Sequence, residues 1–129
     1  MSRSVYDTRF SIEHFYSSDD RVLRKTRSEL ETKREKRVST IVLHELYGIS
    51  LKKEGRSIAK LRVEVLRAHF RTVDVDAKIA VQAAELRHRY KIPMGDSIIA
   101  ATSQLLKASC VTDDPYFTRV REIKTRWIK

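Results

Sequence analysis

Four acidic side chains spread along a chain of 129 residues are the groups best suited to do chemistry: Asp7, Glu45, Asp96 and Asp114. Carboxylates are the hard oxygen ligands that Mg²⁺ and Mn²⁺ prefer in proteins. Crowded together without a cation, they would repel one another and raise one another's pKa values. We therefore predict that these residues are catalytic and metal-ligating, provided that the fold brings them to one place.

Three of these acids also have an ordinary structural explanation. Asp7 closes a short apolar stretch, where Asp often makes a turn. Asp96 lies in the first turn of a predicted helix, where an acid complements the helix dipole. Asp114 can cap a helical turn that starts at Pro115, and Asp113 competes for that role.

Glu45 is harder to explain by folding alone. On an ideal helix, the residues within about 60° of it are mostly apolar, namely Ile41, Val42, Gly48 and Ile49. An acid on an apolar strip costs free energy unless a partner neutralises it. A metal ion is one such partner, and Lys52 on the same face is the alternative.

The chain alternates between predicted strands and helices. Strands are expected over residues 4–7, 38–39, 70–75, 109–112 and 122–128. Helices are expected over 9–16, 19–37, 41–53 (capped by Thr40, with Gly55 past its end), 56–69 and 95–107. A further helix, capped by Asp76, is expected to run to Tyr90, and a helical turn is expected from Asp113 or Asp114 to Val120. This alternation predicts one α/β domain, residues 1–129, with a parallel sheet covered on both faces. The carboxyl ends of such strands meet at one edge, where ligands bind.

Two C-terminal motifs place the acids in a known pattern. They are Gly95–Ala101 (GDSIIAA) and Val111–Phe117 (VTDDPYF), and they follow Asp7-Thr8 and the early-helix Glu45. Together they resemble the PIN domain over essentially the whole chain. The resemblance implies a three-layer α/β/α fold around a mainly parallel five-stranded sheet, and Mg²⁺- or Mn²⁺-dependent cleavage of RNA. Many compact members are toxins of the VapC type, restrained by an antitoxin protein and commonly homodimeric.

The resemblance also implies a role for each acid. Asp7, Asp96 and Asp114 are the expected main metal ligands, with Asp114 rather than Asp113 matching the Thr-x-Asp-x-x-Phe pattern. Glu45 is expected to bind the metal directly or through water, or to orient the nucleophile.

Three neighbours of the acids bear on the site. Thr8 and Thr112 are expected to hydrogen-bond a carboxylate or phosphate, although Thr112 also suits a plain β-branched strand position. Arg9 stands where the family often has Asn or Ser, so it is expected to change the charge of the pocket.

A net charge of +10 and an isoelectric point near 10.0 favour a polyanionic partner such as RNA. The stretch 19–37 carries eight Lys or Arg against three Glu, so Arg9 and residues 21–37 are the candidate phosphate contacts. A solvated helix with pairs such as Glu29 and Lys33 is the alternative.

The sequence indicates a cytoplasmic protein. The single cysteine, Cys110, lies among apolar neighbours, so it is expected to be a buried thiol rather than a disulfide or zinc ligand. No run of about 18 apolar residues predicts a membrane span, and the N-terminus lacks the apolar stretch of a signal peptide.

Three functions remain in competition. The leading one is a metal-dependent endoribonuclease, potentially the toxin of a toxin–antitoxin pair. The second is a catalytically inactive RNA-binding module, in which Arg9 replaces a metal. The third, a metal-dependent phosphotransferase, lacks a phosphate loop or a covalent-nucleophile motif.

Overall fold

The computed structural model describes residues 3–128 and contains a five-stranded sheet of order β3-β2-β1-β4-β5. Every neighbouring pair of strands is parallel. The strands are β1 (Arg3–Tyr6), β2 (Glu35–Ser39), β3 (Arg71–Val73), β4 (Ser109–Val111) and β5 (Thr125–Arg126). The prediction of a parallel five-stranded sheet is therefore confirmed.

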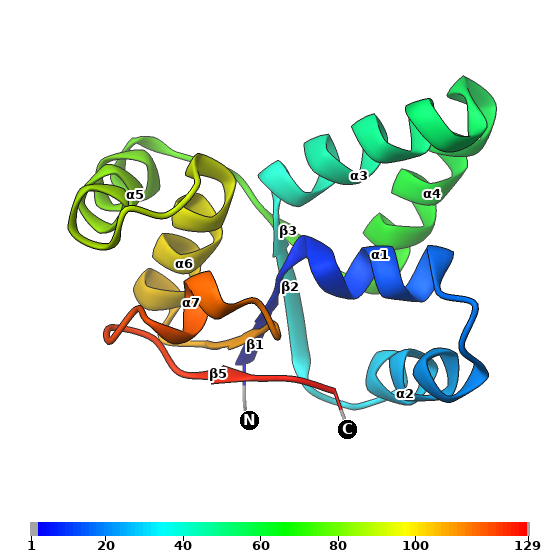
Figure 1. The fold of residues 1–129 in the computed structure, drawn as a ribbon, viewed down its shortest axis with the longest axis horizontal. Helices are drawn as coiled ribbons and strands as arrows, with labels where there is room; N and C mark the ends of the chain where they lie inside the picture. Colours follow the sequence, from blue (N-terminus) through cyan, green and yellow to red (C-terminus); the bar gives the residue numbers. More distant parts are fainter. Residues whose placement is uncertain (1–2, 129) are drawn as a thin grey trace.

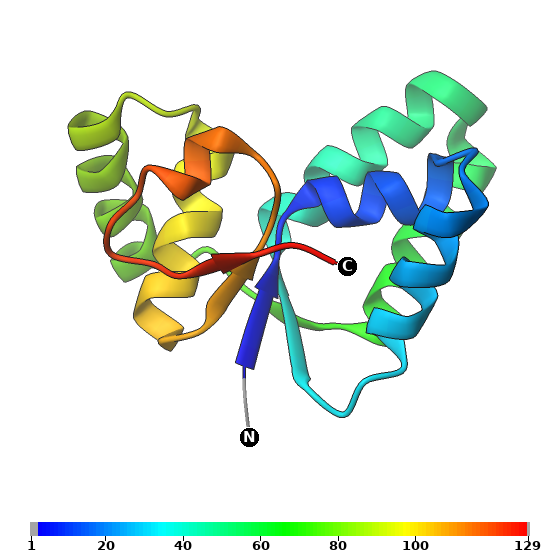
Figure 2. The ribbon, with the colours of Figure 1, turned by 60° about the horizontal axis from the view of Figure 1, so that its bottom comes forward.

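Helices cover the sheet from two sides (Figures 1 and 2). One side carries α1 (Thr8–Tyr16), α2 (Asp20–Leu30), α3 (Thr40–Glu54) and α4 (Arg56–His69). The other carries α5 (Ala77–Tyr90), α6 (Met94–Leu106) and α7 (Pro115–Thr118). This is the predicted three-layer α/β/α arrangement. Within residues 3–128, no helix is both long and apolar enough to cross a membrane.

Local sequence signals account for several helix ends. The carboxylate of Asp76 accepts a hydrogen bond from Ile79 N at 2.9 Å and caps α5 as predicted. Gly55 ends α3 at a φ of 85°, a conformation that glycine adopts without steric cost. The cap of α3 differs from the prediction, because Ser39 Oγ rather than Thr40 accepts the hydrogen bond, from Ile41 N.

The predicted helix over residues 19–37 is wrong in its second half. Helix α2 ends at Leu30, and Glu35–Arg37 belong to β2 instead of a helix. These charged residues pair with β1, and Arg37 also begins the pairing with β3. Backbone pairing with β1, and at Arg37 also with β3, outweighs the helix propensity of a Lys- and Glu-rich segment, which is a weak local preference.

The two edge strands are shorter than predicted for a related reason. Strand β3 pairs with only three residues of β2, and β5 pairs with only Cys110 and Val111 of β4. An edge strand extends only as far as its neighbour offers hydrogen bonds, so the predicted ranges 70–75 and 122–128 were too long.

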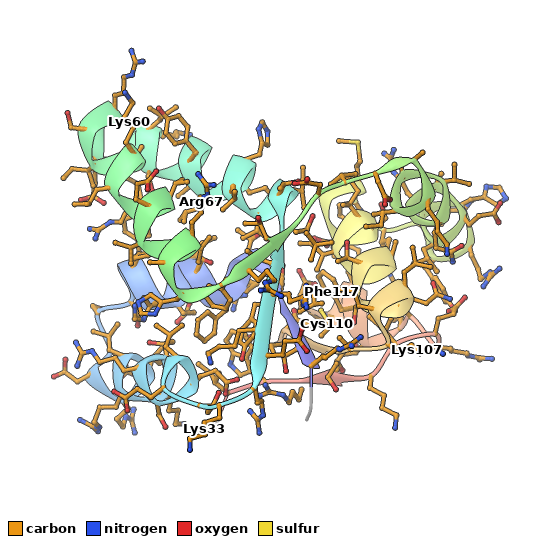
Figure 3. The ribbon with its side chains drawn as sticks, turned by 180° about the vertical axis from the view of Figure 1, so that it is seen from behind. Lys33, Lys60, Arg67, Lys107, Cys110 and Phe117 are labelled. Carbon is orange, nitrogen blue, oxygen red and sulfur yellow. The ribbon has the colours of Figure 1, made fainter. Side chains whose placement is uncertain are left out.

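Aromatic and small apolar side chains fill the space between sheet and helices. Tyr6 makes edge-to-face contacts with Phe10 and Phe70, at ring-centroid distances of 5.0 and 4.9 Å. Cys110, on β4, and Phe117, on α7, are also buried in the interior (Figure 3). Cys110 is a fully buried free thiol, as predicted.

The chain reverses its direction across the sheet between β1 and β4. Strands β2 and β3 are added on one side of β1, whereas β4 and β5 are added on the other. In parallel sheets such a reversal leaves a crevice beyond the carboxyl ends of the two strands, where ligands bind. Asp7 and Thr112 are the residues that directly follow β1 and β4.

Candidate functional site

A small pocket of about 200 Å³ lies at this crevice, and all four predicted acids line it. Its lining consists of Asp7, Thr8, Arg9, Ile12, Glu45, Ile49, Asp96 and Asp114. The acids come from four separate elements: the end of β1, the second turn of α3, the first turn of α6 and the residue before α7. The structure therefore brings together side chains that lie up to about a hundred residues apart.

Asp7 is the most deeply buried of the four acids, with only 2% of its surface exposed. Its backbone N–H continues the β1–β4 ladder by donating to Val111 O at 3.1 Å. Burial raises the pKa of its carboxyl group to about 6, although a hydrogen bond from Thr112 opposes the rise and the charges of Asp114 and Glu45 add to it. This acid is costly to ionise without a compensating cation.

Asp114 both caps a helix and lines the acidic pocket. Its Oδ1 accepts a hydrogen bond from Tyr116 N at 2.9 Å, so Asp114, and not its competitor Asp113, caps α7. Its own N–H donates to Thr112 Oγ1 at 3.0 Å, and that hydroxyl donates in turn to Asp7 Oδ2 at 2.8 Å. Thr112 is thus more than a β-branched strand residue, because its hydroxyl joins two of the acids.

Asp96 projects from the first turn of α6 and is partly buried. Its pKa is raised to about 7, first by burial and then by the charges of Asp7, Asp114 and Glu45. Among residues 3–128, no group donates a hydrogen bond to the Asp96 carboxylate or forms an ion pair with it. The positive end of the α6 dipole offsets only part of this cost.

Glu45 packs its carboxylate against the start of α6. Thr8 Oγ1 donates a hydrogen bond of 2.5 Å to Glu45 Oε1, and an ideal Cβ built on Gly95 would lie only 2.6 Å from Glu45 Oε2. Gly95 therefore provides the room that this carboxylate occupies. The alternative partner, Lys52, makes no contact of this kind with Glu45 among the described residues.

In the part of the chain that the structure describes, no basic side chain forms an ion pair with the four acids. Eight ion pairs occur among residues 3–128, and none of them includes Asp7, Glu45, Asp96 or Asp114. Four carboxylates around one pocket, two with raised pKa values, form a strongly negative site inside a protein of net charge +10.

Arg9 reaches the rim of the pocket but is paired elsewhere. Its guanidinium makes two hydrogen bonds with the carboxylate of Asp113, at 2.9 and 3.0 Å. Asp113, treated from the sequence only as a competing cap, is therefore the counterion of Arg9. The opposite charges of residues 9 and 113 could have predicted this pair. The two residues are 104 positions apart, so nothing in the sequence indicated that they come together.

The donor chemistry of the pocket fits a hard divalent cation, although the carboxylates do not form a finished coordination shell. In the described part of the chain, no three Asp, Glu, His or Cys side chains are close enough to hold an ion as they stand. Mg²⁺ usually retains several waters and needs only one or two protein carboxylates. Unneutralised acids with raised pKa values are the feature that a cation would relieve.

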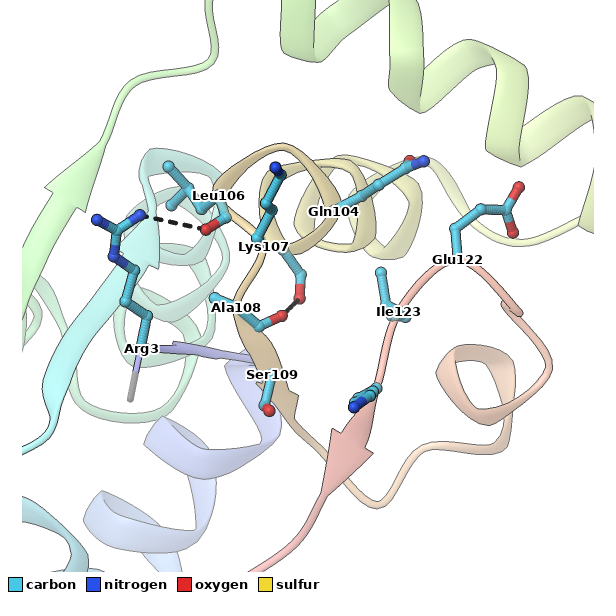
Figure 4. A pocket seen from close by; sticks show the side chains of 10 residues that line it. Arg3, Gln104, Leu106, Lys107, Ala108, Ser109, Glu122 and Ile123 are labelled. Carbon is cyan, nitrogen blue, oxygen red and sulfur yellow. Dashed lines mark hydrogen bonds between the residues drawn. The ribbon is translucent and has the colours of Figure 1, made fainter. Parts of the chain in front are cut away.

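A larger pocket, of about 640 Å³, lies away from the acids (Figure 4). Its lining includes Arg3, Lys107 and Lys124, and its one carboxylate belongs to Glu122. Glu122 is engaged by Arg89 and by the hydroxyl of Tyr90. This pocket has the wrong donors for divalent-metal chemistry, so size does not identify the candidate site.

The basic residues proposed from the stretch 21–37 lie outside the acidic pocket. Arg21, Arg24 and Lys25 line a separate depression with Ile128, and of the predicted phosphate contacts only Arg9 lines the acidic pocket. Lys33, Lys60 and Lys107 project outward from different parts of the molecule (Figure 3). Within the described chain, the positive charge is spread over several faces.

Glu29 also departs from the predicted pairing with Lys33. It is 8% exposed and binds Arg126 at 2.7 Å and Arg34 at 3.3 Å, and it accepts a short hydrogen bond from Tyr6. This network joins α2 to the sheet next to Asp7 and is structural in character.

The chain has an α/β fold with an all-parallel sheet and a cluster of acids at its switch point. The PIN domain family model matches residues 5–123. The chain therefore belongs to the PIN-domain family, as its C-terminal motifs indicated. No curated protein matches the chain significantly.

Solved structures agree with this assignment at the level of the fold. A chain of DNA-bound VapBC from Salmonella typhimurium superposes with a TM-score of 0.81 at 21% identity, covering 98% of both chains. A chain of VapBC2 from Rickettsia felis, bound to a DNA fragment from its promoter, gives 0.80 at 18% identity, with 98% of both chains covered. VapC20 from Mycobacterium tuberculosis, a toxin that cleaves the Sarcin-Ricin loop, gives 0.75 at 19% identity, covering 94% of this chain and 98% of the other.

Proposed function

We propose that this protein is a metal-dependent endoribonuclease that hydrolyses RNA phosphodiester bonds at the acidic pocket. The observation that carries the proposal is the convergence of Asp7, Glu45, Asp96 and Asp114 in one pocket, where none of them is ion-paired with a basic side chain of residues 3–128. The PIN-domain membership supports the same chemistry. The net charge of +10 favours a polyanionic substrate.

Asp7, Asp96 and Asp114 would hold Mg²⁺ or Mn²⁺, and Glu45 would bind it directly or through water, or orient the nucleophile. The metal supplies a Lewis acid that stabilises negative charge on the phosphate and acidifies a bound water. The chain itself positions the carboxylates: Thr112 holds Asp7, and Thr8 with Gly95 sets the position of Glu45.

The test is cleavage of single-stranded and structured RNA with Mg²⁺, with Mn²⁺ and with EDTA. We expect Asp96→Asn to abolish cleavage, because the amide removes a negative ligand while keeping its shape. Glu45→Gln is expected to be impaired, with Glu54→Gln on the same helix as the matched control. Equal activity of wild type and Asp96→Asn would reject the proposal, as would no cleavage with either metal.

A catalytically inactive RNA-binding module is the alternative function. It depends on Arg9 taking the place of a metal, and the pairing of Arg9 with Asp113 speaks against that role. In this alternative, RNA binding survives both EDTA and Asp96→Asn, and no RNA is cleaved.

We further propose that the protein acts as the toxin of a toxin–antitoxin pair, in the cytoplasm and as a homodimer. Chains with its fold occur in VapBC complexes and in a toxin–antitoxin complex from Klebsiella pneumoniae (24% identity, TM-score 0.72). Expression should arrest growth for the wild type and not for Asp96→Asn, and co-expression of the product of the adjacent upstream reading frame should relieve the arrest. Light scattering would measure the oligomeric state.

A further inference from the structure

An exposed aromatic side chain, Tyr116, follows two residues after Asp114, which lines the acidic pocket. Tyr116 is the second residue of α7 and is 42% exposed. The other exposed large hydrophobic residues among residues 3–128 are aliphatic side chains or methionine: Leu51, Leu61, Val75, Val81 and Met94. Packing of the core does not require this aromatic ring, since 42% of Tyr116 is exposed to solvent.

The backbone of Tyr116 is tied to the acids by consecutive hydrogen bonds. Tyr116 N donates to Asp114 Oδ1 at 2.9 Å, Asp114 N donates to Thr112 Oγ1 at 3.0 Å, and Thr112 Oγ1 donates to Asp7 Oδ2 at 2.8 Å. The next residue, Phe117, is fully buried and anchors α7 in the core. The backbone from which the Tyr116 ring projects is therefore fixed in position relative to the buried Asp7.

A free cation accompanies the ring. The guanidinium carbon of Arg119 lies 5.3 Å from the Tyr116 ring centroid, within the range of a cation–π contact. Arg119 is exposed and takes part in no ion pair within residues 3–128, whereas Arg9 at the rim is paired with Asp113. The Arg119 contact leaves 42% of the Tyr116 surface exposed to solvent.

We propose that Tyr116 stacks on an unpaired nucleobase next to the scissile phosphate, while Arg119 attracts the adjoining backbone phosphate. This inference rests on the proposed function. Aromatic side chains bind single-stranded nucleic acid in this way because every base has a π-face, and Arg adds charge attraction to the backbone. Stacking of this kind would make the enzyme selective for single-stranded RNA without recognition of a particular base.

The experiment compares steady-state cleavage of a fluorescent single-stranded RNA in Mn²⁺ by wild type and variants. Tyr116→Ala is expected to raise KM by about fivefold to a hundredfold with little change in kcat, because base stacking on an aromatic side chain contributes about 1–3 kcal/mol. Tyr116→Phe and Tyr116→Trp should keep a KM near that of wild type. Arg119→Ala should raise KM and weaken its dependence on salt.

Two controls separate stacking from a structural role. Val81→Ala, which changes an exposed side chain on α5, should leave KM and kcat unchanged. An abasic nucleotide beside the cleaved bond should raise KM for the wild type, and Tyr116→Ala should cause no further increase with that RNA. Thermal unfolding of Tyr116→Ala should match wild type, since the cap uses only the backbone of Tyr116.

The results distinguish this inference from the proposed function. If wild type cleaves RNA and Tyr116→Ala leaves KM unchanged, or lowers kcat alone, the stacking role is overturned and the nuclease stands. If Tyr116→Ala raises KM equally for intact and abasic RNA, stacking is also rejected. If wild type cleaves no RNA, both the inference and the proposed function are overturned.

Discussion

Thr112 donates a hydrogen bond from Oγ1 to Asp7 Oδ2 at 2.8 Å, linking residues 105 positions apart in the chain. Because this bond lowers the pKa of Asp7 against the effect of burial, we expect Thr112→Val to raise that pKa. A buried hydrogen bond lost in this way typically costs about 1–3 kcal/mol. Urea unfolding would measure the loss, and the pH profile of RNA cleavage should shift to higher pH.

Thr112→Ser is the matched variant, since it keeps the hydroxyl and removes only a methyl group. It should restore the pH profile of the wild type. A Thr112→Val profile that does not move would show that the hydrogen bond has no influence on the ionisation of Asp7.

Gly95 and Glu45 give a second prediction, in which activity falls without a matching loss of stability. The added Cβ of Gly95→Ala would lie 2.6 Å from Glu45 Oε2 and must displace this flexible carboxylate. We expect about a tenfold loss of cleavage, comparable to a modest misplacement of a catalytic group, and a melting temperature close to that of wild type.

Gly48→Ala is the control for that experiment, because nothing lies within 4 Å of its added Cβ. In the interior of α3 it should stabilise the protein by about 0.5–1 kcal/mol, the helix propensity difference between Ala and Gly, and it should leave cleavage unchanged. If Gly95→Ala and Glu45→Gln each reduce activity but combine additively, Glu45 is not the target of the clash.

The raised pKa values of Asp7 and Asp96 predict how the metal-free protein responds to pH. Both folded-state values, about 6 and about 7, lie above the ordinary Asp value of 3.8. The folded state therefore holds protons that the unfolded state releases, so stability falls as pH rises from about 4 to 7 and then levels off. Each unit of pKa difference corresponds to about 1.4 kcal/mol.

Chemical unfolding in EDTA at pH 5 and pH 8 would measure this decline. Asp96→Asn should make the decline smaller, because the amide does not ionise and only Asp7 then contributes. Mn²⁺ should stabilise the wild type more at pH 8 than at pH 5, since protons compete with the metal for the carboxylates. Equal Mn²⁺ stabilisation of wild type and Asp96→Asn at pH 8 would remove Asp96 from the set of ligands.

The buried carboxylate of Glu29 should be important for stability rather than for cleavage. Burial opposes its ionisation, but hydrogen bonds from Arg126 and Tyr6 and the charge of Arg34 lower its pKa overall. Glu29→Ala leaves Arg126 without its counterion and is expected to cost about 3–5 kcal/mol, as when one partner of a buried pair is removed.

The exposed pair of Glu54 and Arg62 provides the comparison for Glu29. Glu54→Ala should cost less than about 1 kcal/mol, the usual range for surface ion pairs. Denaturation midpoints that differ little between the two variants would show that the network around Glu29 is not cooperative.

Arg9 should be dispensable for cleavage, because both of its side-chain hydrogen bonds go to Asp113 and none goes to the four acids of the pocket. Arg9→Ser, which restores a residue typical of the family, is expected to keep metal-dependent cleavage and to change stability by less than about 1 kcal/mol. Activity measured against Mn²⁺ concentration would test this. A large gain in Mn²⁺ affinity would indicate that Arg9 competes with the metal.

The sequence alone determined the class of the fold and the identity of the acids that meet. Alternating strands and helices predict a parallel sheet, and Asp7 and Asp114 follow strands whose carboxyl ends must share one edge. The motifs around Asp96 and Asp114 are local sequence patterns, so they can be recognised in a single sequence. The cap at Asp76 and the helix end at Gly55 were predictable for the same reason.

Tertiary structure decided the remaining features, because each depends on residues distant in sequence. Residues 35–37 became part of β2 only because β1 paired with all three and β3 paired with Arg37 as well. Arg9 acquired its hydrogen-bonded counterion only because Asp113 lies beside it in the fold. Thr112 acquired its role only when β1 and β4 came into register. Spacing along a chain predicts periodic and local contacts, whereas these pairings require the packed sheet.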